Sequence, residues 1–140
     1  MEENIITTTP AEEAIGKLPE NPTPADIARY AVAVLDMKKA RDLKLLHTTE
    51  QTVIADYFVI ASGTSRTHMK TLADELSFKL GENGVPTLRT EGDGSGGWIL
   101  IDLGSVIVHV FGAEARQFYN LEKLYGKASE EDISALVSEN

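Results

Sequence analysis

The side chains with the most chemical potential lie inside one apolar stretch, Gly96 to Phe111. Trp98, Asp102 and His109 occur there among isoleucine, leucine and valine. An imidazole can act as a general base, and a carboxylate can bind a metal ion. A tryptophan, by contrast, is a frequent anchor of protein–protein contacts. The stretch could therefore form a catalytic pocket, a partner-binding surface or part of a core.

A two-residue turn at Gly104-Ser105 predicts which of these side chains share a face of a β-hairpin. One face is wholly aliphatic and pairs Leu103 with Val106, Ile101 with Val108, and Ile99 with Val110. The other face is mixed and pairs Asp102 with Ile107, Leu100 with His109, and Trp98 with Phe111. We expect the aliphatic face to pack against helices. The mixed face is either an open patch for a partner or a surface covered by a helix or a second copy, and the pattern leaves both open.

The evidence for catalysis is weak elsewhere in the sequence. The turn Ser62-Gly63-Thr64-Ser65 precedes a predicted helix, but it lacks the lysine and spacing of a phosphate-binding P-loop, so we interpret it as a helix cap. The three histidines share no metal-ligand spacing, and no nucleophile accompanies His109. We therefore expect no catalytic residue, cofactor or metal. The enzymatic alternative is a magnesium-dependent nucleotidyltransferase-like protein that uses Asp56 and Asp102.

Composition limits the class of protein. The 140 residues fit one domain, and the absence of cysteine excludes disulfides and thiolate metal sites. No apolar run approaches the roughly 20 residues of a membrane helix, and the first residues do not resemble a secretion signal, so we expect a cytoplasmic protein. The net charge is −9, but residues 1–24 carry five acids against one lysine and residues 126–140 carry four against one. The scattered basic residues disfavour sequence-specific nucleic-acid binding, whereas a basic protein partner suits this charge.

Hydrophobic periodicity predicts an α/β fold, with a small mixed sheet packed by helices on one side. We expect a mobile N-terminal extension over residues 1–22, one α/β domain over 23–126, and an acidic C-terminal helix or tail over 127–140. The predicted elements are a helix from Pro24 to about Arg41, strands at 44–48, 53–63 and 85–90, a helix after Ser65, the hairpin, and a helix over 113–125. In that last helix, we expect Phe118, Tyr119 and Leu124 to dock against the sheet, and Arg116 either to pair with an acid or to face a partner.

Several segments together resemble the ribosomal silencing factor family, also called RsfS or Iojap. The resemblance runs in unbroken order from about Ala25 to Tyr125. It rests on KKARDL at 38–43, ADYFVIASGTSRTH at 55–68, Trp98, IDLGSVIVHVF at 101–111 and ARQFYNLEKLY at 115–125.

This resemblance implies a domain similar in shape to nucleotidyltransferases but without their catalytic residues. Family members bind the large ribosomal subunit through ribosomal protein fourteen, at the face where the small subunit docks. Bound there, they block joining of the subunits and lower translation when nutrients are scarce. The resemblance thus implies a translational repressor, with a homodimer as a further possibility.

The resemblance also nominates partner-binding residues. Trp98 matches the family's strand tryptophan and is the expected anchor, with Leu100 and Phe111 extending the apolar contact and Asp102 pairing with a basic partner residue. Tyr57 and Arg116 match family positions but could equally have internal roles, and His109 matches the family with a structural role favoured over direct contact. The sequence departs from the family pattern at Leu103, Ser105 and Tyr125, where an aromatic residue, an acid and a tryptophan are common.

Overall fold

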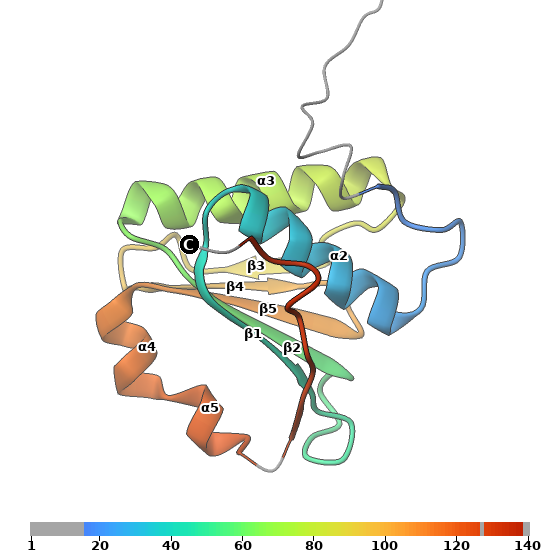
Figure 1. The fold of residues 1–140 in the computed structure, drawn as a ribbon. Helices are drawn as coiled ribbons and strands as arrows, with labels where there is room; N and C mark the ends of the chain where they lie inside the picture. Colours follow the sequence, from blue (N-terminus) through green and yellow to red (C-terminus); the bar gives the residue numbers. More distant parts are fainter. Residues whose placement is uncertain (1–15, 127, 139–140) are drawn as a thin grey trace, which may run out of the picture.

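A computed structural model of the chain describes residues 16–126 and 128–138. It shows the expected α/β fold, a mixed six-stranded sheet with strand order β3-β4-β5-β2-β1-β6 (Figure 1). β2 and β5 are parallel, and the other neighbouring strands are antiparallel. The elements are α2 (Pro24–Met37), β1 (Arg41–His47), β2 (Tyr57–Ser62), α3 (Arg66–Glu82), β3 (Arg89–Glu91), β4 (Trp98–Asp102), β5 (Val106–Phe111), α4 (Ala113–Tyr119), α5 (Leu121–Leu124) and β6 (Ser129–Glu130).

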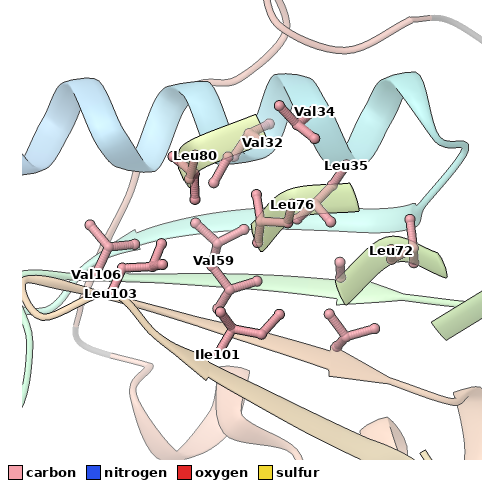
Figure 2. Close-up of a cluster of buried hydrophobic side chains, with 14 of the residues drawn as sticks. Val32, Val34, Leu35, Val59, Leu72, Leu76, Leu80, Ile101, Leu103 and Val106 are labelled. Carbon is pink, nitrogen blue, oxygen red and sulfur yellow. The ribbon is translucent and has the colours of Figure 1, made fainter. Parts of the chain in front are cut away.

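The two long helices, α2 and α3, cover one face of the sheet, which we call the inner face (Figure 1). Thr23 caps α2 through a reciprocal hydrogen-bonded pair with Asp26, and the Ser65 side chain accepts a hydrogen bond from the His68 backbone at the start of α3. The turn before α3 is therefore the helix cap that the sequence predicts. Aliphatic side chains from both helices and the sheet interdigitate beneath them, including Val32, Leu35, Val59, Leu72, Leu76, Leu80, Ile101 and Val106 (Figure 2).

The β4–β5 hairpin has the predicted register. Trp98 pairs with Phe111, Leu100 with His109, and Asp102 with Ile107. Gly104 adopts φ +96° in the turn, a conformation that favours glycine, and its N–H donates to Asp102 Oδ1 at 2.8 Å. The aliphatic face of the hairpin is buried in the inner core, as expected.

Two predicted helices end differently in the structure. α2 ends at Met37 rather than near Arg41, because Lys39 adopts φ +69° and Arg41 already begins β1. The single helix expected over 113–125 is broken at Asn120, which has φ +50° and separates α4 from α5. Asparagine tolerates this left-handed conformation better than most residues, which permits the break at this position.

Parts of both chain ends lie within the described residues. Most of the predicted extension over residues 1–22 lies outside the described residues, but Leu18 packs on the inner core and its N–H donates to Asn83 Oδ1. In place of the expected C-terminal helix or tail, residues 128–138 supply the edge strand β6, and Ile133, Leu136 and Val137 pack on the same core. The strand expected over 85–90 is reduced to β3. Within the described ranges, no helix combines the length and apolarity needed to cross a bilayer.

Candidate functional site

Five of the seven nominated residues lie on the sheet face opposite α2 and α3, which we call the outer face. Phe111 and His109 belong to the interior strand β5 and are 0% and 4% exposed. Trp98, Leu100 and Asp102 belong to β4, near the edge of the sheet, and are half-buried. The mixed face of the hairpin is therefore neither fully open nor fully covered. Its side chains on β5 are buried, and its side chains on β4 are partly accessible to solvent.

Helices α4 and α5 provide the partial cover of the outer face (Figure 1). Leu121 is buried against it, and the Tyr125 ring meets Phe58 edge-on with centroids 4.8 Å apart. A small second core results, which contains Leu46, Ala55, Phe58, Ile60, Ile107, Phe111 and Leu121. Trp98 and Leu100 are half-buried and pack against this core.

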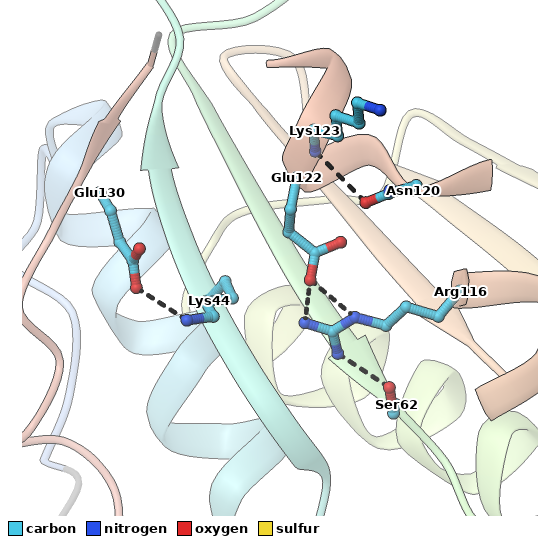
Figure 3. Close-up of polar contacts among 7 residues, drawn as sticks. All are labelled: Lys44, Ser62, Arg116, Asn120, Glu122, Lys123 and Glu130. Carbon is cyan, nitrogen blue, oxygen red and sulfur yellow. Dashed lines mark hydrogen bonds and ion pairs between the residues drawn. The ribbon is translucent and has the colours of Figure 1, made fainter. Parts of the chain in front are cut away.

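Arg116 holds this helical cover in place (Figure 3). Its guanidinium donates to Glu122 Oε2 at 3.0 and 2.7 Å and to Ser62 Oγ at 2.8 Å, and its side chain is only 11% exposed. Burial raises the pKa of Glu122, but the hydrogen bond and charge of Arg116 outweigh burial and lower that pKa below its usual value. The network joins α4, α5 and the end of β2. These contacts are those expected if Arg116 stabilises the fold from within.

Trp98 lies at the centre of an aromatic cluster. Its ring centroid is 4.6 Å from that of Tyr119, 5.0 Å from Phe111 and 5.8 Å from His109. Its Nε1–H donates to His109 Nδ1 at 3.3 Å. The indole is therefore held in one orientation before any partner arrives, which lowers the entropy cost of using it as an anchor.

His109 is a buried, neutral histidine. Because Nδ1 accepts from Trp98, the proton of the neutral ring lies on Nε2, and among the described residues Nε2 has no hydrogen-bond partner. The ring meets Phe58 edge-on at 4.8 Å. Burial lowers its pKa from 6.5 to about 4. These contacts fit a structural histidine that orients Trp98.

We expect the His109 ring to stay neutral, with its proton on Nε2, throughout pH 5–8. In the unfolded chain the ring gains a second proton, on Nδ1, below about pH 6.5, whereas in the folded protein it does so only near pH 4, so His109 lowers stability as the pH falls between these values. Nitrogen-15 NMR of the ring against pH measures both tautomer and pKa. A titration midpoint near 6.5 in the folded protein would contradict this assignment.

The helical cover presents apolar side chains outward, contrary to the expectation that they dock the last helix. Phe118, Tyr119 and Leu124 are 80%, 46% and 71% exposed. The break at Asn120 changes the direction of the chain between α4 and α5. The two helices are attached to the sheet through Arg116 and Leu121 instead. Tyr119 contacts both Trp98 and Phe118. We call Trp98, Leu100, Phe118 and Tyr119 the apolar patch; the sequence pattern does not point to its last two members as binding candidates.

Tyr57 lies apart from this patch. It packs against the inner core and stacks on His47 with ring centroids 4.6 Å apart. Burial, followed by the charges of Glu131 and Asp56, raises its pKa. The structure therefore does not bring Tyr57 together with Trp98.

The two acids of the enzymatic alternative are also separated. Asp56 precedes β2, while Asp102 ends β4, two strands away and so about 10 Å distant by strand spacing. The turn at Ser62–Ser65 follows the opposite end of β2, roughly 20 Å from Asp56. Asp102 instead accepts from the Gly104 N–H and lies 3.6 Å from Arg89. In the described part of the chain, no group of three or more metal-ligating acids, histidines or cysteines is gathered.

Comparison with known proteins identifies relatives of this fold and site. The family model RsfS, described as ribosomal silencing factor during starvation, matches residues 21–140. The ribosomal silencing factor RsfS of Bacillus subtilis is 39% identical over 107 residues, covering 76% of this chain and 91% of the relative. The chloroplastic protein Iojap of Zea mays is 29% identical over 91 residues, covering 65% and 40%.

A solved structure agrees with these sequence matches. The crystal structure of a protein from Chromobacterium violaceum superposes with a TM-score of 0.72 at 35% identity, covering 74% of this chain and 87% of that one. The names of the family and of the Bacillus subtilis relative describe a ribosomal silencing factor, and neither name describes an enzyme. The match to the family model includes every strand of the sheet and the residues of the Trp98 cluster. The chain therefore belongs to the RsfS family of ribosomal silencing factors.

Proposed function

We propose that this protein represses translation by binding the large ribosomal subunit through ribosomal protein fourteen and blocking the small subunit from joining. Membership of the silencing-factor family supports the ribosome as the target. The observation that carries the proposal is the apolar patch, in which half-buried side chains of β4 adjoin exposed aromatic side chains of α4. Such patches mark protein-binding surfaces.

The physical features of the patch suit a tight contact. Trp98 is pre-oriented by His109 and flanked by Tyr119, so its burial by a partner would cost little ordering entropy. Tryptophan and tyrosine are enriched among residues that dominate binding energy. Asp102 adds a carboxylate at the rim, where its bond to Arg89 is long at 3.6 Å and can be exchanged for a basic residue of the partner.

The mechanism requires occupancy of a surface and no chemical step. A protein bound at the inter-subunit face excludes the small subunit sterically, and its effect depends on concentration and affinity. We place this action in the cytoplasm, during nutrient limitation.

A second copy of the chain could use the same patch. Self-association would then compete with ribosome binding, because both would bury Trp98. Mass measurement across a dilution series separates a stable dimer from a monomer. If the dimer uses the patch, substitutions in the patch that weaken ribosome binding should also weaken the dimer.

The proposal is tested by binding to purified large subunits and to isolated ribosomal protein fourteen. We expect the wild-type protein to co-sediment with large subunits but not with small subunits, and to bind the isolated protein directly. Binding to large subunits that does not involve ribosomal protein fourteen would overturn the proposed partner. Failure to bind large subunits would overturn the function.

A further inference from the structure

A groove of about 690 Å³ continues the apolar patch beyond Trp98. It lies between α4 and the glycine-rich loop of residues 94–97, with the first turn of α3 at its end. Tyr119 both lines this groove and contacts Trp98, so a partner seated on the patch would also reach the groove.

The walls of the groove are aromatic and its loop side is largely backbone. Phe118 is 80% exposed and meets Tyr119 edge-on, with ring centroids 5.0 Å apart. On the loop side, Gly97 has φ +81°, and a Cβ atom there would stand 2.9 Å from Ala115. The close approach of the loop to α4 thus depends on glycine.

The charges of the groove favour a cation. Arg66 lies within it, but Asp93 compensates its charge at 3.3 Å. Glu114 is exposed in the first turn of α4, and none of the ion pairs among the described residues includes it. A phosphate or other anion entering the groove would meet this uncompensated carboxylate, whereas a cation would be attracted both by the carboxylate and by the faces of the aromatic rings.

We propose that this groove takes an arginine or lysine side chain of the protein partner, placed on the exposed ring of Phe118 beside Tyr119 and paired with Glu114. Arginine fits best, because a planar guanidinium can stack on a ring while it donates to a carboxylate. The inference rests on the proposed function, since the partner that presents the cation is the one that covers the apolar patch. It assigns Phe118 and Glu114 to specificity, beside the anchoring role of Trp98.

Two substitutions separate this role from simple apolar contact, and each has a matched control on α3. Phe118→Leu keeps an apolar side chain but removes the ring; Phe78→Leu makes the same change at a position that is 60% exposed. Glu114→Gln removes one exposed charge; Glu82→Gln does so at the far end of α3, a 17-residue helix about 25 Å long. All four positions are exposed, so we expect the variants to fold normally.

Dissociation constants for purified large subunits, measured at low and high salt, provide the first readout. We expect Phe118→Leu to weaken binding about 5- to 10-fold and Glu114→Gln about 3- to 5-fold at low salt, with the Glu114 effect shrinking at high salt. Both controls should bind within about twofold of wild type. If Trp98→Ala loses binding while Phe118→Leu and Glu114→Gln bind normally, the cation site is wrong and the proposed function stands.

A second readout does not involve the ribosome. In an amide NMR titration with ethylguanidinium, we expect shifts concentrated in residues 94–97 and 114–119, and reduced shifts in Glu114→Gln. Shifts at these positions in a protein that fails to bind large subunits would support the cation site and reject the proposed partner. An absence of localised shifts at saturating probe would overturn the site.

Discussion

Replacing Trp98 with alanine is expected to weaken binding to the large ribosomal subunit by about 2–4 kcal/mol, or roughly 30- to 1,000-fold. The indole is half-buried on the outer face and is already oriented by His109 and Tyr119. A partner that completes its burial removes a large apolar surface from water without having to order the side chain first. Titration of labelled protein with purified large subunits measures the effect.

The folding of this variant must be checked separately, because Trp98 also contacts Phe111 and His109. Urea unfolding and an amide NMR spectrum establish whether Trp98→Ala is native at the assay temperature. Leu100→Ala, on the same strand and face, provides a milder variant and should weaken binding by about tenfold or less. A folded Trp98→Ala protein that binds with wild-type affinity would show that the patch is not the interface.

Replacing Phe111 with alanine is expected to lower the free energy of unfolding by about 3–5 kcal/mol. The family resemblance nominates Phe111 as a contact residue, but its side chain is 0% exposed, beneath Trp98 and the helical cover. The alanine variant leaves a cavity in the small second core. Urea denaturation measures this loss.

Phe111→Leu provides the matched variant, because it retains most of the apolar volume. We expect it to be destabilised by less than the alanine variant and, while folded, to bind large subunits nearly as well as wild type. A Phe111→Leu protein of native stability that no longer binds would mean that the partner reaches Phe111 directly, and that the helical cover moves away on binding.

The parts of the fold that follow from local sequence were predictable. Glycine at position 104 fixes a tight turn, and the wholly aliphatic face that this turn creates fixes the register, so the pairing of Trp98 with Phe111 is confirmed. Thr23 and Ser65 start their helices because their hydroxyls satisfy free backbone N–H groups. These signals act within a few residues and need no knowledge of the tertiary structure.

The helical cover could not be predicted in the same way. The FYNLEKLY segment has the pattern of one amphipathic helix, and only the left-handed Asn120 turns Phe118 and Leu124 outward. The docking of Arg116 on Ser62 joins residues 54 positions apart, which no local pattern reveals. The same limitation applies to Tyr57, whose strand alternation places it on the inner face only once β2 is paired with β5.

Residue type alone does not decide whether polar side chains meet in a site. Asp56 and Asp102 are plausible ligands in isolation, but the sheet order inserts β5 between their strands. The sequence favours a structural His109 over a general base, and its burial and its bond from Trp98 are consistent with that interpretation. In each case the long-range topology decides the role of the side chain.

The most direct test of the account is a subunit-joining assay in which large subunits are incubated with the protein before small subunits are added. Light scattering or gradient sedimentation then measures the fraction of complete ribosomes. The account predicts that wild-type protein lowers this fraction in proportion to its occupancy of large subunits, and that a folded Trp98→Ala protein does not at the same concentration. Normal joining on large subunits saturated with wild-type protein would contradict it.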